Sequence, residues 1–133
     1  MVKYVLSLAM VLVGAVVAVG ADAPLTHTKD SLDTVKSNLS DGKAVLVDVR
    51  EPKETAEGHV KGAVLIPKSK LTVAEEVAGL VKGLDKSKIV YTHCGAGKRA
   101  LECGEILKKQ GFDVRPLKMG YKQLIEGGLE KAK

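Results

Sequence analysis

The chain has 133 residues, which is enough for one domain and too few for two. Its 21 basic residues exceed its 16 acidic ones and give a formal net charge of +5, but all except three of the basic residues are lysines scattered along the chain. Aromatic residues make up only 3% and tryptophan is absent, so base-stacking side chains are scarce and nucleic-acid binding is not indicated. An apolar content of 45% excludes disorder over most of the chain.

The amino-terminal segment has the layout of a secretory signal. Lys3 precedes an unbroken apolar run that ends at Gly20, and small residues follow. With cleavage after Gly20 or Ala21, we expect residues 1–21 to be a signal peptide and residues 22–133 to be the mature domain. This predicts export to the bacterial periplasm, with no stable membrane association after cleavage. An uncleaved anchor is the alternative, since the run is near the lower limit for crossing a bilayer.

The remaining chain alternates between helical and strand-like patterns. Residues 24–29 form a short lead-in, for which an edge strand is one alternative. Apolar residues over 32–39 have helical spacing, and we expect that helix to end at Gly42. The run 44–49 is almost continuously apolar, which is typical of a parallel strand buried on both faces. A second apolar run covers 63–66 and predicts another strand.

The second half continues the alternation. Residues 72–75 have the pattern of a capping box, which predicts the beginning of a helix there. Further along the chain we expect a strand over 88–93, a helix that Gly111 ends, a strand over 114–117 and a short final helix. Together these elements predict a single α/β domain with a mainly parallel sheet flanked by helices on both faces.

Two reactive or charged side chains come at the ends of predicted strands. Asp48 closes the first buried strand, and Cys94 directly follows the strand over 88–93. Ligands of parallel sheets bind beyond the carboxyl ends of the strands, so we expect Asp48 and Cys94 to face one crevice.

The loop Cys94-Gly-Ala-Gly-Lys-Arg99 joins a strand to a helix. Gly95 and Gly97 allow the backbone to fold back so that several N–H groups converge on one point. The helix dipole, Lys98 and Arg99 add positive potential there. All of these features favour a thiolate, so we expect the pKa of Cys94 to lie below the usual value of about 8.5. An inert cysteine at the end of a strand is the alternative.

Cys103 has a different setting. It falls on the apolar stripe of the following helix, which indicates a small core residue. A resolving or disulfide partner for Cys94 is the alternative, although a position a turn or more along the helix is too far for disulfide geometry.

Histidine chemistry, metal binding and nucleotide binding are not favoured. His93 and Cys94 are neighbours on a strand and should point to opposite faces, so His93 is interpreted as structural rather than as a base. The histidines and cysteines show no paired ligand spacing, which argues against a metal site. Gly97-Lys98 lacks the following Ser or Thr of a phosphate-binding loop.

Two segments, in this order, resemble the rhodanese family of sulfurtransferases. The segment DVREPKETAEGHVKGAVLIP, from Asp48 to Pro67, is similar to the family's first block in identity and spacing. The loop from Cys94 to Arg99 is similar to its active loop, which begins with Cys and holds six residues. The resemblance covers residues 25–130, and a single domain led by a signal looks most like the small exported members.

The resemblance implies a two-step transfer of sulfane sulfur without a cofactor. Cys94 would take the outer sulfur of thiosulfate and pass it from a persulfide to cyanide or an acceptor thiol. The substrate-binding and active loop would consist of Gly95, Ala96, Gly97, Lys98 and Arg99. Asp48 and Arg50 would support this loop, or would form a plain structural ion pair. An oxidising compartment also implies a partner protein that reduces Cys94 or accepts its sulfur.

Other functions remain as alternatives. The main one is a non-enzymatic sulfur carrier that a partner protein loads. The intact loop argues against a silent binding module, and Arg99 follows Cys94 after four residues, one fewer than in the related phosphatases. Thr55 stands where the family often has an aromatic residue, and the carboxyl-terminal segment lacks the family's Trp and Pro. The Gly-Ala-Gly sequence resembles loops that accept mercaptopyruvate, while the two cations favour thiosulfate.

Overall fold

The computed structural model describes residues 23–133. The expected signal peptide and the anchor alternative both lie outside these residues. Within residues 23–133, no helix has the length and apolar character needed to cross a bilayer.

Four parallel strands form the centre of the domain in the order β2-β1-β3-β4. Their bounds are β1 Ala44–Asp48, β2 Val64–Leu65, β3 Ile89–His93 and β4 Asp113–Pro116. The two central strands, β1 and β3, are buried along most of their length, as their apolar runs predicted. β4 lies at an edge of the sheet, where Pro116 costs no ladder hydrogen bond.

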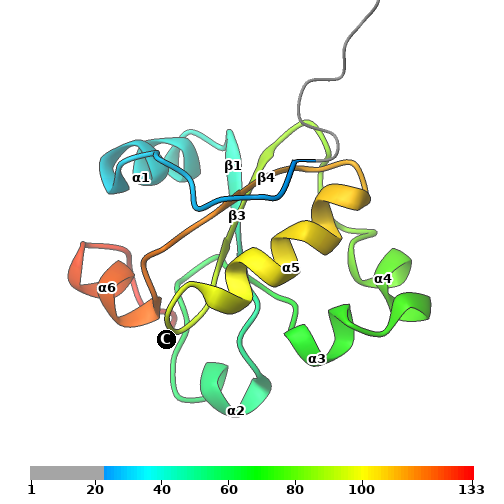
Figure 1. The fold of residues 1–133 in the computed structure, drawn as a ribbon. Coiled ribbons are helices and arrows are strands. Elements are labelled where there is room, and N and C mark those ends of the chain that lie inside the picture. Colours follow the sequence, from blue (N-terminus) through cyan, green and yellow to red (C-terminus); the bar gives the residue numbers. More distant parts are fainter. Residues whose placement is uncertain (1–22) are drawn as a thin grey trace, which may run out of the picture.

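Helices cover both faces of this sheet. They are α1 Leu32–Ser40, α2 Pro52–Thr55, α3 Lys68–Leu71, α4 Ala74–Leu80, α5 Lys98–Lys109 and α6 Tyr121–Glu126. α1 and α6 lie on one face, and α3, α4 and α5 lie on the other (Figure 1). The predicted α/β fold with a parallel sheet between helices is confirmed.

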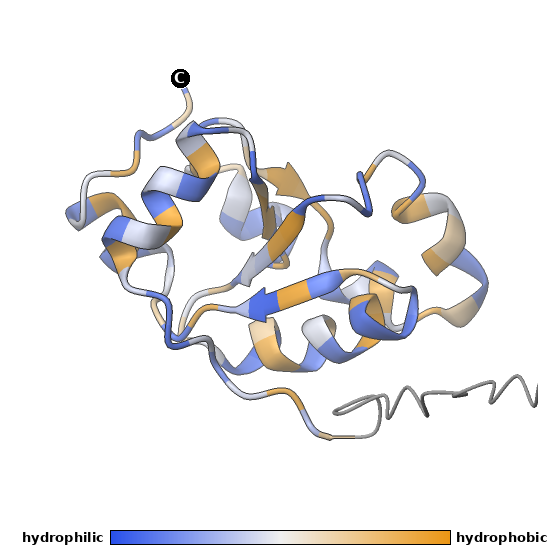
Figure 2. Cartoon of the chain, turned by 90° about the horizontal axis from the view of Figure 1, so that it is seen from above, coloured by the Kyte–Doolittle hydropathy of each residue, from blue (hydrophilic) through white to orange (hydrophobic). Residues whose placement is uncertain are grey.

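Each face of the sheet has its own apolar core. Successive strand residues point to opposite faces, so Leu46 and Tyr91 pack toward α1 and α6, while Val47 and Val90 pack toward α5. Figure 2 shows apolar residues along the central strands and mixed polar and apolar residues on the helices. The same alternation continues past the end of β3 and determines where the polar side chains of the candidate site point.

Two edge predictions need correction. The run 63–66 forms only the two-residue strand β2, whose side chains are 37% and 43% exposed, because β2 lies at the outer edge of the sheet. The lead-in over 24–29 forms no strand, and Thr28 makes a single backbone hydrogen bond of 2.8 Å to the carbonyl of Pro116.

The capping box predicted over 72–75 is wrong. Thr72 ends α3, and its hydroxyl donates to the carbonyls of Lys68 and Ser69 one turn earlier. A threonine hydroxyl bonds backbone carbonyls as readily as it caps a helix, and here the short preceding helix supplies them. α4 therefore begins at Ala74, after Val73.

Candidate active site

Cys94 lies at the point where β3 turns into α5. Its side chain is 1% exposed, and the backbone N–H of Gly97 donates to Sγ over 3.0 Å. Gly97 has a φ of +96°, a conformation that side chains rarely adopt, so a glycine is needed to aim this N–H at the sulfur. A directed N–H at the beginning of a helix stabilises negative charge on sulfur, in the thiolate and in a persulfide alike.

Residues 118–121, which lead into α6, hold the loop in place from one side. The N–H of Tyr121 donates to the carbonyl of Cys94 over 3.0 Å. Gly120 packs so closely that a Cβ there would lie 1.8 Å from the carbonyl oxygen of Gly95. A Cβ on Gly97 would likewise lie 2.9 Å from the carbonyl oxygen of Lys118. Residues 118–121 and the loop therefore fit together only because these positions have no side chain.

The amino-terminal lead-in holds the loop from a second direction. The His27 imidazole lies 2.9 Å from the carbonyl oxygen of Gly97, to which its N–H donates. A histidine outside the regular elements thus satisfies a carbonyl of the loop, which keeps the Gly97 peptide oriented.

Arg99, on the first turn of α5, is bound by a carboxylate. Its Nη1 and Nη2 lie 2.5 and 3.0 Å from the two carboxylate oxygens of Glu54, and both side chains are partly exposed. The hydrogen bond from Arg99 lowers the pKa of Glu54 to about 2. Lys98, the other predicted donor-binding cation, is exposed.

This Glu54–Arg99 pair was missed in the sequence, where Glu54 was interpreted as a scaffold residue that makes turn or helix contacts. The two residues are separated by 45 positions. Only the acid-base complementarity of the two blocks could have suggested the pairing.

Asp48 and Arg50 form a buried ion pair. Arg50 Nη2 lies 2.8 Å from Asp48 Oδ2 and 2.8 Å from the carbonyl oxygen of Gly58, and its Nε also donates to Asp48. Asp48 is fully buried and pairs with His93, whereas Cys94 packs in the core beneath α5, so the expectation that Asp48 and Cys94 face one crevice is wrong. The Arg50 guanidinium lies 4.1 Å over the ring of Tyr121, which connects this pair to the segment that holds the loop.

His93 sits beside Asp48 and away from Cys94's face of the sheet. The register pairs His93 with Asp48, and its Nε2 lies 3.4 Å from Asp48 Oδ2. Burial lowers the pKa of His93. Cys94, one residue later, packs instead in the core beneath α5. The interpretation that His93 is structural and not a base for Cys94 agrees with this arrangement.

Cys103 is a core residue, as its helical position predicted. It is fully buried among the apolar residues beneath α5, and both cysteines are free. Burial raises the pKa of Cys103 to about 12, so its thiol stays protonated and unreactive.

The domain also matches a known family by sequence. The profile of the rhodanese-like domain matches residues 31–126. The chain belongs to the rhodanese-like domain family. The match includes the segment from Asp48 and the loop from Cys94, the two parts from which the site is built.

Similarity to individual curated proteins is more distant. The chain is 40% identical over 70 residues to the probable adenylyltransferase/sulfurtransferase MoeZ of Mycobacterium tuberculosis. This match covers 53% of the chain but only 17% of MoeZ. It is 30% identical over 105 residues to the human thiosulfate:glutathione sulfurtransferase, covering 72% of this chain and 91% of that protein. The putative sulfur carrier protein YrkF of Bacillus subtilis is 32% identical over 83 residues, covering 62% of this chain and 42% of YrkF.

The fold is also similar to solved structures of rhodanese-like domains. The crystal structure of a rhodanese-like domain protein from Staphylococcus aureus gives a TM-score of 0.59 at 29% identity, and the match covers 77% of this chain and 95% of that one. Sulfur transfer is the chemistry that the family and these named relatives support for this chain.

Proposed function

We propose that the protein is a rhodanese-type sulfurtransferase that takes sulfane sulfur from thiosulfate onto Cys94 and passes it to cyanide or a thiol. The observation that carries the proposal is the Gly97 N–H held 3.0 Å from Cys94 Sγ by a left-handed glycine. The name of the human relative, which contains both thiosulfate and glutathione, supports this choice of donor and acceptor class.

Each step transfers one neutral sulfur atom. In the first, the Cys94 thiolate attacks the outer sulfur of thiosulfate, the S–S bond breaks, and sulfite leaves with the bonding electrons. In the second, cyanide or an acceptor thiolate attacks the terminal persulfide sulfur, and the Cys94 thiolate is the leaving group. The loop N–H faces an anionic sulfur before and after each step, so the same group serves both halves of the reaction.

The test is the intact mass of the purified protein after incubation with thiosulfate. We expect a gain of one sulfur atom that cyanide removes with release of thiocyanate. Cys94→Ser should show no gain, while Cys103→Ala should load like the wild type. Failure of the wild type to gain sulfur, with Cys94 still free to react with an alkylating agent, would exclude thiosulfate as the donor.

A sulfur carrier without turnover of its own is the second candidate. The similarity to YrkF, whose name describes a putative carrier, favours it. Turnover separates the two functions, because a carrier loads once from small donors, or not at all, and shows no sustained release of thiocyanate. A steady-state rate with thiosulfate and cyanide would support the enzyme.

Export and a protein partner are part of the same proposal. The buried, protonated Cys103 makes a poor resolving thiol, so Cys94 in an oxidising periplasm would depend on its persulfide or on a reducing or sulfur-accepting protein. Cell fractionation, with sequencing of the amino terminus, tests the location and the expected cleavage. An uncut protein in the cytoplasm would contradict it.

A further inference from the structure

The carboxylate of Glu54 occupies both outer nitrogens of Arg99, the arginine of the active loop. The two hydrogen bonds, of 2.5 and 3.0 Å, use the fork of donors with which arginine binds oxyanions. An oxyanion donor therefore cannot bind Arg99 in this way unless it displaces Glu54.

This ion pair lies against the residue that follows the nucleophile. A Cβ on Gly95 would be 3.3 Å from Arg99 Nη2 and 4.0 Å from a carboxylate oxygen of Glu54. The negative charge of Glu54 is thus next to the loop backbone that a donor must approach to reach Cys94.

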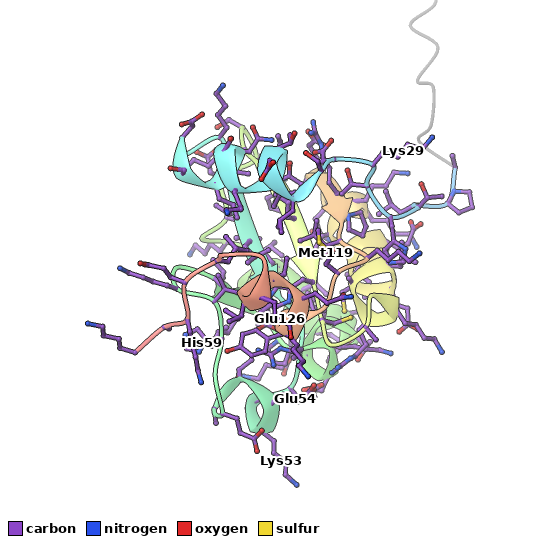
Figure 3. The ribbon with its side chains drawn as sticks, turned by 90° about the vertical axis from the view of Figure 1, so that its left-hand side faces the viewer. Lys29, Lys53, Glu54, His59, Met119 and Glu126 are labelled. Carbon is purple, nitrogen blue, oxygen red and sulfur yellow. The ribbon has the colours of Figure 1, made fainter. Side chains whose placement is uncertain are left out.

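Glu54 is fixed in this position by its own helix. Its carboxylate accepts the backbone N–H of Glu51 over 3.2 Å, in a capping box at the beginning of α2. Glu54 lies on the side of α2 that faces the rest of the molecule, whereas its neighbour Lys53 points away (Figure 3). Since the hydrogen bond from Arg99 lowers the pKa of Glu54 to about 2, the carboxylate remains charged at any ordinary assay pH.

We propose that Glu54 determines donor specificity: it neutralises Arg99 and so disfavours dianionic donors relative to persulfides of lower charge. The part of this inference that concerns sulfur transfer rests on the proposed function. With Arg99 neutralised, Lys98 is the remaining cation of the loop from Cys94 to Arg99 that can attract thiosulfate. A donor R–S–S⁻ carries less charge into the site. Cys94 would attack its terminal sulfur, the S–S bond would break, and RS⁻ would leave with the electron pair.

The first experiment removes the charge and keeps the shape. Glu54→Gln retains an acceptor for Arg99 and for the α2 cap, and Glu54→Asp restores the charge on a shorter side chain. Glu76→Gln, on the exposed surface of α4, is the matched control for net charge. We expect kcat/KM for thiosulfate to rise about tenfold in Glu54→Gln, to stay near wild type in Glu76→Gln, and to fall back toward wild type in Glu54→Asp.

A second readout tests the same charge without sulfur transfer. The alkylation rates of Cys94 with anionic iodoacetate and with neutral iodoacetamide are measured on the same variants. Because the electrostatic free energy scales with probe charge, a tenfold effect on a dianion corresponds to about a threefold effect on a monoanion. We expect the ratio of the iodoacetate rate to the iodoacetamide rate to rise about threefold in Glu54→Gln.

The outcomes separate this inference from the proposed function. If thiosulfate fails to load the wild type but the alkylation ratio rises, the thiosulfate proposal fails and the charge effect stands. An unchanged ratio overturns the inference, whatever thiosulfate does. Loss of thiosulfate activity in Glu54→Gln also overturns it, because Glu54 would then be needed to position Arg99 for the donor.

Discussion

Replacing Gly120 by alanine tests whether the contact between residues 118–121 and the active loop controls the site. Gly120 has a φ of −83° and a ψ of 174°, which alanine adopts without strain, so the effect of the substitution is purely steric. The added Cβ would lie 1.8 Å from the carbonyl oxygen of Gly95, and real Cβ contacts are not shorter than 3.0 Å. The two backbone segments must therefore separate by about 1.2 Å.

Two magnitudes follow from that displacement. Overpacking of this kind costs about 1–3 kcal/mol of unfolding free energy. A catalytic group misplaced by about 1 Å loses on the order of 100-fold in rate, and the displaced carbonyl belongs to the residue after Cys94. We expect Gly120→Ala to lose stability in urea unfolding and to slow persulfide formation, followed by quenched intact-mass measurements.

Gly83→Ala is the matched control. A Cβ there would meet no heavy atom within 4 Å, and Gly83 has no left-handed φ. We expect it to change the unfolding free energy by less than about 0.5 kcal/mol and to leave the rate of loading unchanged. If Gly120→Ala also matched the wild type in both measurements, the close contact would not determine the loop geometry, and the reasoning would be refuted.

Three further predictions concern buried groups. Cys103 should resist iodoacetamide at pH 8 in the folded protein and react only after denaturation, because its pKa is raised to about 12, and labelling of the native protein at both cysteines would contradict this. Asp48→Asn should lower the free energy of unfolding in urea by about 3–5 kcal/mol, because it leaves the buried guanidinium of Arg50 without its charged partner. A loss below about 1 kcal/mol would argue against a structural role of this ion pair. Burial lowers the pKa of His93 in the folded state, so the unfolded chain takes up the proton first as the pH falls. The free energy of unfolding should therefore be highest above about pH 6.5 and decline as the pH falls below that value. His93→Gln should reduce this decline when unfolding is measured across that pH range.

The order of elements and the active loop were predictable because their signals are local. Central parallel strands are buried on both faces, so β1 and β3 appear in the sequence as continuous apolar runs. The loop from Cys94 to Arg99 joins consecutive elements, and its glycines and cations are neighbours in the chain. No knowledge of the tertiary fold was needed to expect N–H groups around that sulfur.

Contacts between distant segments were not predictable. Gly120 is one of 14 glycines, and nothing near it in the sequence distinguishes it from a glycine in a plain turn. A glycine is required at position 120 because the folded chain brings the carbonyl oxygen of Gly95 against it. The expectation for Asp48 failed for a related reason, since only the register, which pairs Asp48 with His93, shows that it points away from the face where Cys94 packs.

The two kinds of group at the site suit different parts of the proposed two-step sulfur transfer. The Gly97 N–H carries no charge of its own, so it would stabilise the thiolate and the persulfide of Cys94 without attracting free anions strongly. Arg99 is the group that would hold an anionic donor or the departing sulfite, and Glu54 competes for it. Such a site stabilises the sulfur of Cys94 strongly but binds the donor weakly. It therefore releases the first product, sulfite, readily and leaves room for the acceptor. If this division is correct, removing the charge of Glu54 should slow the release of sulfite even as it improves the capture of thiosulfate.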